Sequence, residues 1–66
     1  MFENRFYSIG EVAKVLGVTR VAVYAWRRRG KFPHGVQFGS ARRYSGEELN
    51  EWVKARYEAE ANEAGI

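Results

Sequence analysis

The sequence predicts a single, mostly α-helical domain of three helices with a small β-hairpin between the second and the third. Two capping boxes, at Ser8 and Ser45, mark helix starts, Gly17 separates two short segments of helical apolar spacing, and residues 36–44 alternate instead. The chain has 66 residues and no cysteine, so packing alone must stabilise its one small core unless the protein is an oligomer.

The first helix is expected at residues 9–16. The Ser8 hydroxyl can accept from the amide of Glu11, and the Glu11 carboxylate can accept from the amide of Ser8. Gly17 provides the left-handed residue that ends such a helix. The apolar residues between them share one face at helical spacing: Ile9, Val12, Ala13 and Leu16.

The second helix is expected at residues 20–29. Thr19 is the expected N-cap, Val18 is expected to return to the core, and Gly30 with Pro33 prevents continuation. On a helical wheel, Thr19, Ala22, Val23 and Trp26 face the core. The two short helices and the turn between them form a helix-turn-helix.

The segment beyond Pro33 changes period and predicts a two-stranded wing. Val36 and Phe38 alternate with Gln37, residues 39–40 supply turn chemistry, and residues 42–44 return along a second short strand. The predicted fold is therefore a winged helix-turn-helix.

The third helix is expected to begin at the capping box of Ser45 and Glu48. Its apolar face carries Leu49, Trp52, Val53 and Tyr57. Residues 1–66 are expected to form one domain with a core at about residues 6–57. Residues 58–66 offer nothing large to bury, so this tail is expected to fray or to contact a partner chain.

Charge is distributed unevenly along the chain. Residues 12–46 carry eight basic residues and no acidic one, whereas residues 47–63 carry six glutamates against Lys54 and Arg56. A one-sided basic surface on a small domain is typical of a nucleic-acid binder. We therefore expect double-stranded DNA as a partner.

The outer face of the second helix combines cations with an aromatic ring. Arg20 would occupy the first helical position, where the helix dipole disfavours a cation, so an arriving phosphate or guanine edge would account for it. Arg42 and Arg43 point to opposite sides of a strand, so one is expected to reach DNA and the other to lie near Trp52, with the choice open. The candidate DNA-binding residues are Thr19, Arg20, Val21, Tyr24, Arg27, Arg28, Arg42 and Arg43.

Other function classes lack support in the sequence. His34 is the single histidine and has no carboxylate close in sequence, and the glutamates lack the histidine or aspartate partners of a metal site. No apolar run is long enough to span a membrane, and the N-terminus lacks a signal peptide. We expect a cytoplasmic protein that is not an enzyme and has no cofactor, metal or small-molecule ligand.

Several short segments together resemble a known family. They are YSIGEVA at residues 7–13, LGVTR at 16–20, VYAW at 23–26, GKFP at 30–33 and RRY at 42–44. This series is similar to small winged-helix proteins of the MerR superfamily, in particular phage excisionases and AlpA-like regulators, over about residues 6–57. We expect neither the effector domain nor the long dimerisation helix of MerR regulators within these 66 residues.

The resemblance implies a DNA-binding protein in a bacterial host cell. Its second helix would enter the major groove, with Thr19, Arg20, Val21, Tyr24 and Arg28 as contacts, and its wing would place Arg42 and Arg43 on the minor groove or backbone. An excisionase would bind and bend attachment-site DNA and steer an integrase, with copies associating head to tail. The alternatives are a transcriptional regulator on an operator and a protein-interaction adaptor that does not bind DNA.

Overall fold

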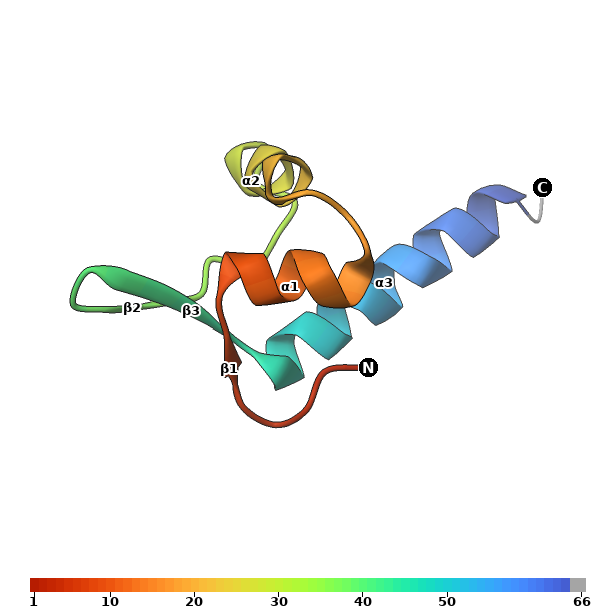
Figure 1. Ribbon diagram of the computed structural model, residues 1–66. Helices are drawn as coiled ribbons and strands as arrows, with labels where there is room; N and C mark the ends of the chain where they lie inside the picture. Colours follow the sequence, from red (N-terminus) through yellow and green to blue (C-terminus); the bar gives the residue numbers. More distant parts are fainter. Residues whose placement is uncertain (65–66) are drawn as a thin grey trace.

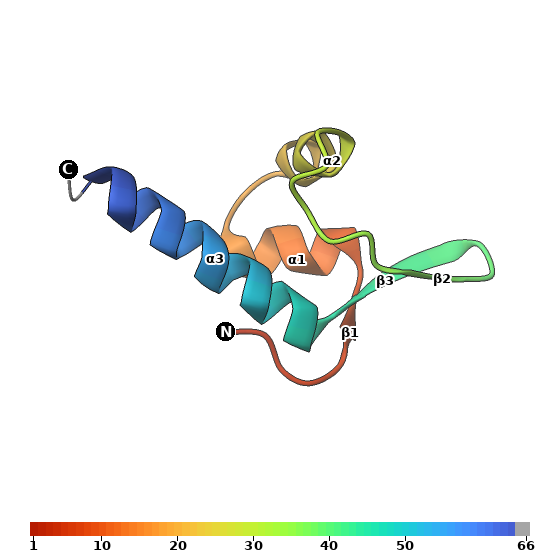
Figure 2. The same cartoon turned by 180° about the vertical axis from the view of Figure 1, so that it is seen from behind.

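The computed structural model describes residues 1–64 and contains three helices and a small antiparallel sheet (Figure 1). The elements in chain order are β1 (Phe6–Tyr7), α1 (Ile9–Leu16), α2 (Arg20–Arg28), β2 (Val36–Phe38), β3 (Ala41–Ser45) and α3 (Gly46–Ala64). This arrangement confirms the predicted winged helix-turn-helix. The wing of β2 and β3 projects from one end of the molecule and α3 from the other (Figure 2).

Side-chain caps fix where the helices begin. At α1, the amide of Glu11 donates to Ser8 Oγ at 3.2 Å and the amide of Ser8 donates to Glu11 Oε1 at 3.0 Å. Thr19 caps α2 by accepting from the amide of Ala22 at 3.2 Å. Ser45 accepts from the amide of Glu48 at 3.1 Å, in the first turn of α3. These local signals are readable in the sequence because each joins residues three apart.

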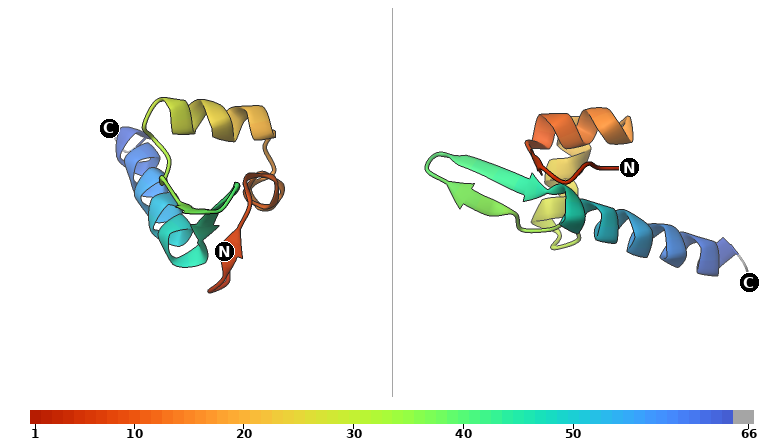
Figure 3. Two further views of the ribbon diagram at one scale, coloured as in Figure 1. Left: turned by 90° about the vertical axis from the view of Figure 1, so that its left-hand side faces the viewer. Right: turned by 90° about the horizontal axis from the view of Figure 1, so that it is seen from below.

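Glycines with positive φ stand at or just after the C-terminal ends of α1 and α2. Gly17 has a φ of 71° and ends α1, so the chain turns and α2 runs across α1 rather than along it (Figure 3). The second helix ends at Arg28, one residue before the expected position, because Arg29 is its C-cap and Gly30 takes a φ of 71°. The tail beyond residue 57 is helical to Ala64, and residues 65–66 of the predicted tail lie outside the described residues.

The sheet has the strand order β1-β3-β2 with antiparallel pairing throughout. The sequence analysis missed β1, because two residues are too few to show an alternating pattern. Paired residues point to the same side of the sheet, so Arg42 lies on the face of Gln37 and buried Tyr44. Arg43 lies on the opposite face, with Val36.

The core lies between the helices and the sheet. Its buried members are Phe2, Tyr7, Ile9, Val12, Ala13, Val23, Phe32, Tyr44 and Leu49, with Leu16, Trp26, Trp52 and Val53 packed against them. The core therefore extends beyond residues 6–57 to include Phe2. Two expectations about it were wrong: Val18 is 36% exposed at the turn, and Tyr57 is 76% exposed where α3 passes beyond the body.

Gly46 lets the N-terminal segment pass directly over the start of α3. A Cβ at this position would lie 1.7 Å from the carbonyl oxygen of Glu3. The amide of Gly46 donates to the carbonyl of Arg5 at 2.8 Å. Any side chain here would displace the segment that carries Phe2 into the core.

Candidate nucleic-acid interface

A cleft of about 560 Å³ opens between α2, the first turn of α1 and the wing. We call it the basic cleft, because the charged side chains that line it are all arginines. Arg20, Tyr24 and Arg27 come from α2, and Gln37, Arg42 and Arg43 come from the wing. Residues predicted from two separate segments of the sequence therefore share one site.

The helical repeat explains the contribution of α2 to this cleft. Positions 20, 24 and 27 are spaced by four and three residues, so Arg20, Tyr24 and Arg27 lie on one face of the helix. Tyr24 is 47% exposed, which leaves its ring and hydroxyl available to a ligand. Val23, on the adjoining side of the helix, is fully buried and holds α2 against the core.

A second hollow of about 500 Å³ adjoins the basic cleft on the outer side of α2. It is lined by Val21, Tyr24, Arg27 and Arg28, so Tyr24 and Arg27 border both hollows. Val21 is 73% exposed within it. Seven of the eight candidate residues thus lie on one continuous surface.

Thr19 is the candidate that borders neither hollow. Its hydroxyl is engaged in capping α2, and the residue is exposed. The expectation that Thr19 faces the core was wrong, because an N-cap residue has extended backbone angles and stands before the helix begins.

The wing places its two adjacent arginines on opposite faces, and both border the basic cleft. Arg42 Nη1 donates to the carbonyl of His34, which holds its guanidinium at the base of the wing. Arg43 Nη1 donates to the carbonyl of Arg42 at 3.0 Å. One of them was expected near Trp52, but both line the cleft, and the Trp52 ring packs edge-on against Phe32 and at a tilt against Trp26.

Arg20 lies against the backbone of α1. An ideal Cβ on Gly10 would lie 2.7 Å from Arg20 Nη2, so the guanidinium fills the space that a side chain would take. Within residues 1–64, the ion pairs join Arg5 to Glu3 and to Glu11, and none involves an arginine of the basic cleft. The positive charge of the cleft is therefore not neutralised by the described part of the chain.

Sequence reasoning missed the polar and backbone surfaces that complete the cleft. Gln37, Ser40 and the start of α1 at residues 8–10 line it beside the arginines. Gln37 could have been found from the period of two along the wing, since it pairs with Arg42. The start of α1 could not have been found from the sequence, because no local pattern indicates that residues 8–10 lie opposite the wing.

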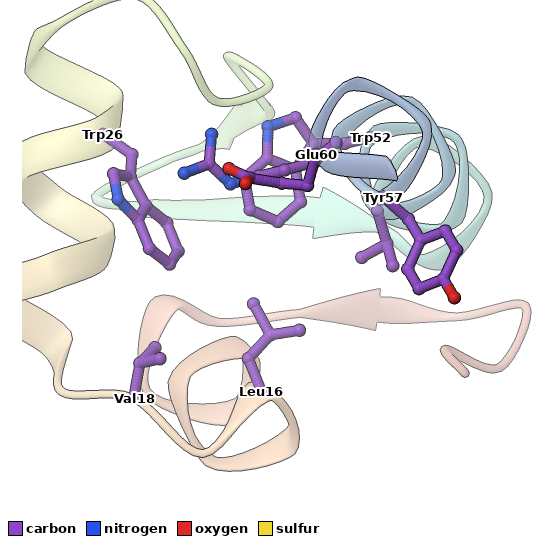
Figure 4. A pocket seen from close by; sticks show the side chains of 8 residues that line it. Leu16, Val18, Trp26, Trp52, Tyr57 and Glu60 are labelled. Atoms are coloured by element: carbon purple, nitrogen blue, oxygen red, sulfur yellow. The ribbon is translucent and has the colours of Figure 1, made fainter. Parts of the chain in front are cut away.

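A third hollow, of about 290 Å³, lies between α3 and the turn that joins α1 to α2 (Figure 4). Its walls are mainly apolar, from Leu16, Val18, Trp26, Trp52, Val53 and Tyr57. The charged residues at this hollow are Arg56, whose guanidinium lies 5.6 Å from the centre of the Trp26 ring, and Glu60. These two charges oppose each other, so this surface lacks the positive potential that a polyanion requires.

The carboxylate of Glu11 is stabilised by hydrogen bonds at the start of α1. Backbone hydrogen bonding from Ser8, and then the bond from Arg5, hold the pKa of Glu11 below its ordinary value.

Within residues 1–64 there is no group of histidine, cysteine, aspartate and glutamate side chains able to hold a metal ion. In the same part of the chain, no helix is long and apolar enough to cross a membrane.

Comparison with known proteins gives one match. A family model described as a helix-turn-helix domain matches residues 6–57, from β1 into α3. Searches of curated proteins and of solved structures found no match. The matched range includes both helices of the turn, the whole wing and every candidate residue.

Proposed function

Since the chain belongs to the helix-turn-helix domain family, we propose that it binds double-stranded DNA in a sequence-specific manner through the basic cleft. The observation that carries this proposal is the convergence of Arg20, Tyr24 and Arg27 with Arg42 and Arg43 around one cleft. Helix-turn-helix proteins lay the second helix in the major groove, and α2 presents its cationic face outward for this role.

Each candidate residue has a role that matches its chemistry. Arg20, at the first position of α2, suits the acceptor edge of a guanine or a phosphate, because guanidinium groups donate in a planar fork. Exposed Val21 suits a thymine methyl group, and the Tyr24 hydroxyl suits a phosphate. Thr19, Arg27 and Arg28 suit the phosphates that border the major groove. Arg42 and Arg43, on the wing, suit the minor groove or the backbone.

Salt dependence tests the DNA-binding proposal directly. If about five or six cations neutralise phosphates, the logarithm of the association constant falls with the logarithm of salt concentration at a slope near about −5. The measurement is fluorescence anisotropy of a labelled duplex titrated with protein at several salt concentrations. A flat response, or no duplex binding at low salt, would contradict the proposal.

We further propose that the protein acts as an excisionase, which binds adjacent sites, bends the DNA and steers an integrase toward excision. The separation of charge supports head-to-tail contact between copies. Arg29, the C-cap of α2, and Lys31 are exposed and line neither the basic cleft nor the second hollow, whereas Glu58 and Glu60 lie exposed on the part of α3 that passes beyond the body. The acidic tail of one copy can therefore meet the basic surface of the next.

Two assays on one DNA fragment distinguish excision control from transcriptional control. An excisionase is expected to fill a multi-site fragment cooperatively in gel shifts and to give position-dependent mobility when the site is moved along a fragment, which reports a bend. A regulator that occupies one operator is expected to give a single shifted species without this bend. The second result would remove the excisionase proposal and leave DNA binding intact.

A further inference from the structure

Gly10 occupies the second position of α1, where the backbone does not require glycine. Four glycines within residues 1–64 adopt positive φ, at positions 17, 30, 35 and 39, and Gly10 is not among them. Glycine inside a helix is less stable than alanine, because its backbone loses more conformational freedom on folding. Neither backbone conformation nor helix stability therefore accounts for glycine at position 10.

The space beside Gly10 is filled by the end of Arg20. An ideal Cβ on Gly10 would lie 2.7 Å from Nη2, 3.0 Å from Cζ and 3.0 Å from Nε of Arg20. These are the atoms of the guanidinium group, so it lies directly against the first turn of α1. Both residues line the basic cleft, which places this contact inside the candidate interface.

This contact gives a long and flexible side chain a backbone surface to lie against before any ligand arrives. Within the described residues, the Arg20 guanidinium makes no ion pair and donates no hydrogen bond, so its N–H groups stay available. A side chain held in its bound position loses less conformational entropy on binding. The backbone of α1 can supply this restraint only if residue 10 has no Cβ.

We propose that Gly10 is a positioning residue for DNA binding, which seats the Arg20 guanidinium against α1 so that it faces the duplex. The inference rests on the proposed function for the role of Arg20. It adds that Gly10, which has no side chain, determines how strongly Arg20 contributes to DNA affinity. Gly10 acts through Arg20 and makes no base contact of its own.

Substitution Gly10→Ala isolates this role. The added methyl group meets only the far end of a flexible side chain, so the guanidinium moves while the fold is retained. Alanine also favours the helix, so thermal stability is expected to stay equal or rise while DNA affinity falls. If the role of Gly10 were purely structural, Gly10→Ala would lower or raise thermal stability and DNA affinity together.

The experiment compares five proteins on one duplex, selected from a randomised pool with the wild-type protein. They are wild type, Gly10→Ala, Arg20→Ala, the double variant, and Val15→Ala as a control on an exposed α1 residue outside the cleft. We expect Arg20→Ala to weaken binding by about tenfold or more and Gly10→Ala by about two- to tenfold. In the Arg20→Ala background, Gly10→Ala should have no further effect, and Val15→Ala should bind as wild type.

A second readout needs no DNA. The Nε–Hε signal of Arg20, assigned by its loss in Arg20→Ala, should shift in NMR spectra of Gly10→Ala while the signals of the other arginines stay in place. An unchanged signal, wild-type affinity of Gly10→Ala, or an equal loss in both backgrounds would overturn the inference. Failure of the wild-type protein to bind any duplex would instead remove the proposed function, and the NMR result would still report whether Gly10 seats Arg20.

Discussion

The side chain of Asn50 forms two hydrogen bonds with the backbone of Phe2. The amide of Phe2 donates to Asn50 Oδ1 at 2.8 Å, and Asn50 Nδ2 donates to the carbonyl of Phe2 at 2.8 Å. Phe2 itself is 5% exposed and packs edge-on against Tyr7, with ring centres 5.0 Å apart. One side chain of α3 thus ties the N-terminal segment to the core.

The first prediction concerns this pair. Asn50→Ala removes both bonds and leaves two partly buried backbone groups of Phe2 without their partner, so we expect a loss of about 1 to 3 kcal/mol of stability. Thermal unfolding followed by circular dichroism measures the loss. The control is Asn4→Ala, an exposed residue expected to change stability by no more than about 0.5 kcal/mol. Equal melting temperatures for the two variants would show that the two hydrogen bonds of Asn50 contribute nothing to stability.

The second prediction concerns Trp52. Its Nε1–H donates to the carbonyl of Lys31 at 2.7 Å, and its ring packs against Trp26 and Phe32. Trp52→Phe should lose mainly the hydrogen bond, at about 1 kcal/mol, whereas Trp52→Ala should lose about 3 kcal/mol because the ring contacts disappear too. Trp26→Ala, on the opposite side of the same contact, should cost a similar amount.

Urea denaturation measures these changes as shifts of the midpoint at constant slope. Tyr57→Ala is the matched control, because its ring lies on the same helix and is 76% exposed. We expect a change of no more than about 0.5 kcal/mol for it. A large loss in Tyr57→Ala, or none in Trp52→Ala, would contradict the core described above.

The third prediction concerns acid stability. The folded state lowers the pKa of Glu11 below its ordinary value of 4.5, chiefly through the backbone amide of Ser8 and then through Arg5. This contribution is present above the unfolded pKa and is lost as pH falls from about 4.5 through the lowered folded pKa. Glu11→Gln keeps a side chain able to cap the helix and removes the titration.

We therefore expect the melting temperature of wild type to fall more steeply than that of Glu11→Gln below about pH 4.5. The other carboxylates titrate in both proteins, so the difference between the two curves isolates Glu11. Parallel curves from neutral pH to acid would rule out a stabilising role for this carboxylate.

The fourth prediction separates the arginines of the proposed interface. Arg20→Ala should cost about 1 to 3 kcal/mol in binding and relax base preference at one position, because a base contact is lost. Arg43→Ala should weaken all duplexes nearly alike and reduce the salt slope by about 1, as expected for a phosphate contact. Arg42→Ala should also lower stability, since it loses the bond to the His34 carbonyl.

Lys54→Ala is the charge-matched control for these variants. It removes one positive charge from α3, at an exposed position that does not line the basic cleft. We expect its duplex affinity and salt slope to match those of wild type, as measured by anisotropy titration. A loss equal to that of Arg43→Ala would mean that net charge, rather than the arrangement of the cleft, governs binding.

Local patterns along the chain were enough to predict the three helices, the wing and the basic character of the site. The caps at Ser8, Thr19 and Ser45 join residues three apart, and the wing follows from alternation over a few positions. These signals are local, so neighbouring residues are enough to specify them. Local signals failed where a residue's neighbours in space decide its burial: Val18 and Tyr57 have core-like spacing but lie at the surface.

Which distant residues contact one another could be seen only in the folded molecule. Phe2 and Asn50 are 48 positions apart in the sequence. Position 46 has no room for a side chain only because the N-terminal segment, with the carbonyl of Glu3, crosses the start of α3 there. The seat of Arg20 on Gly10 depends on how α2 runs across α1, and the basic cleft depends on how the wing faces α2. Such contacts arise from the packing of whole elements, which no pattern of neighbouring residues encodes.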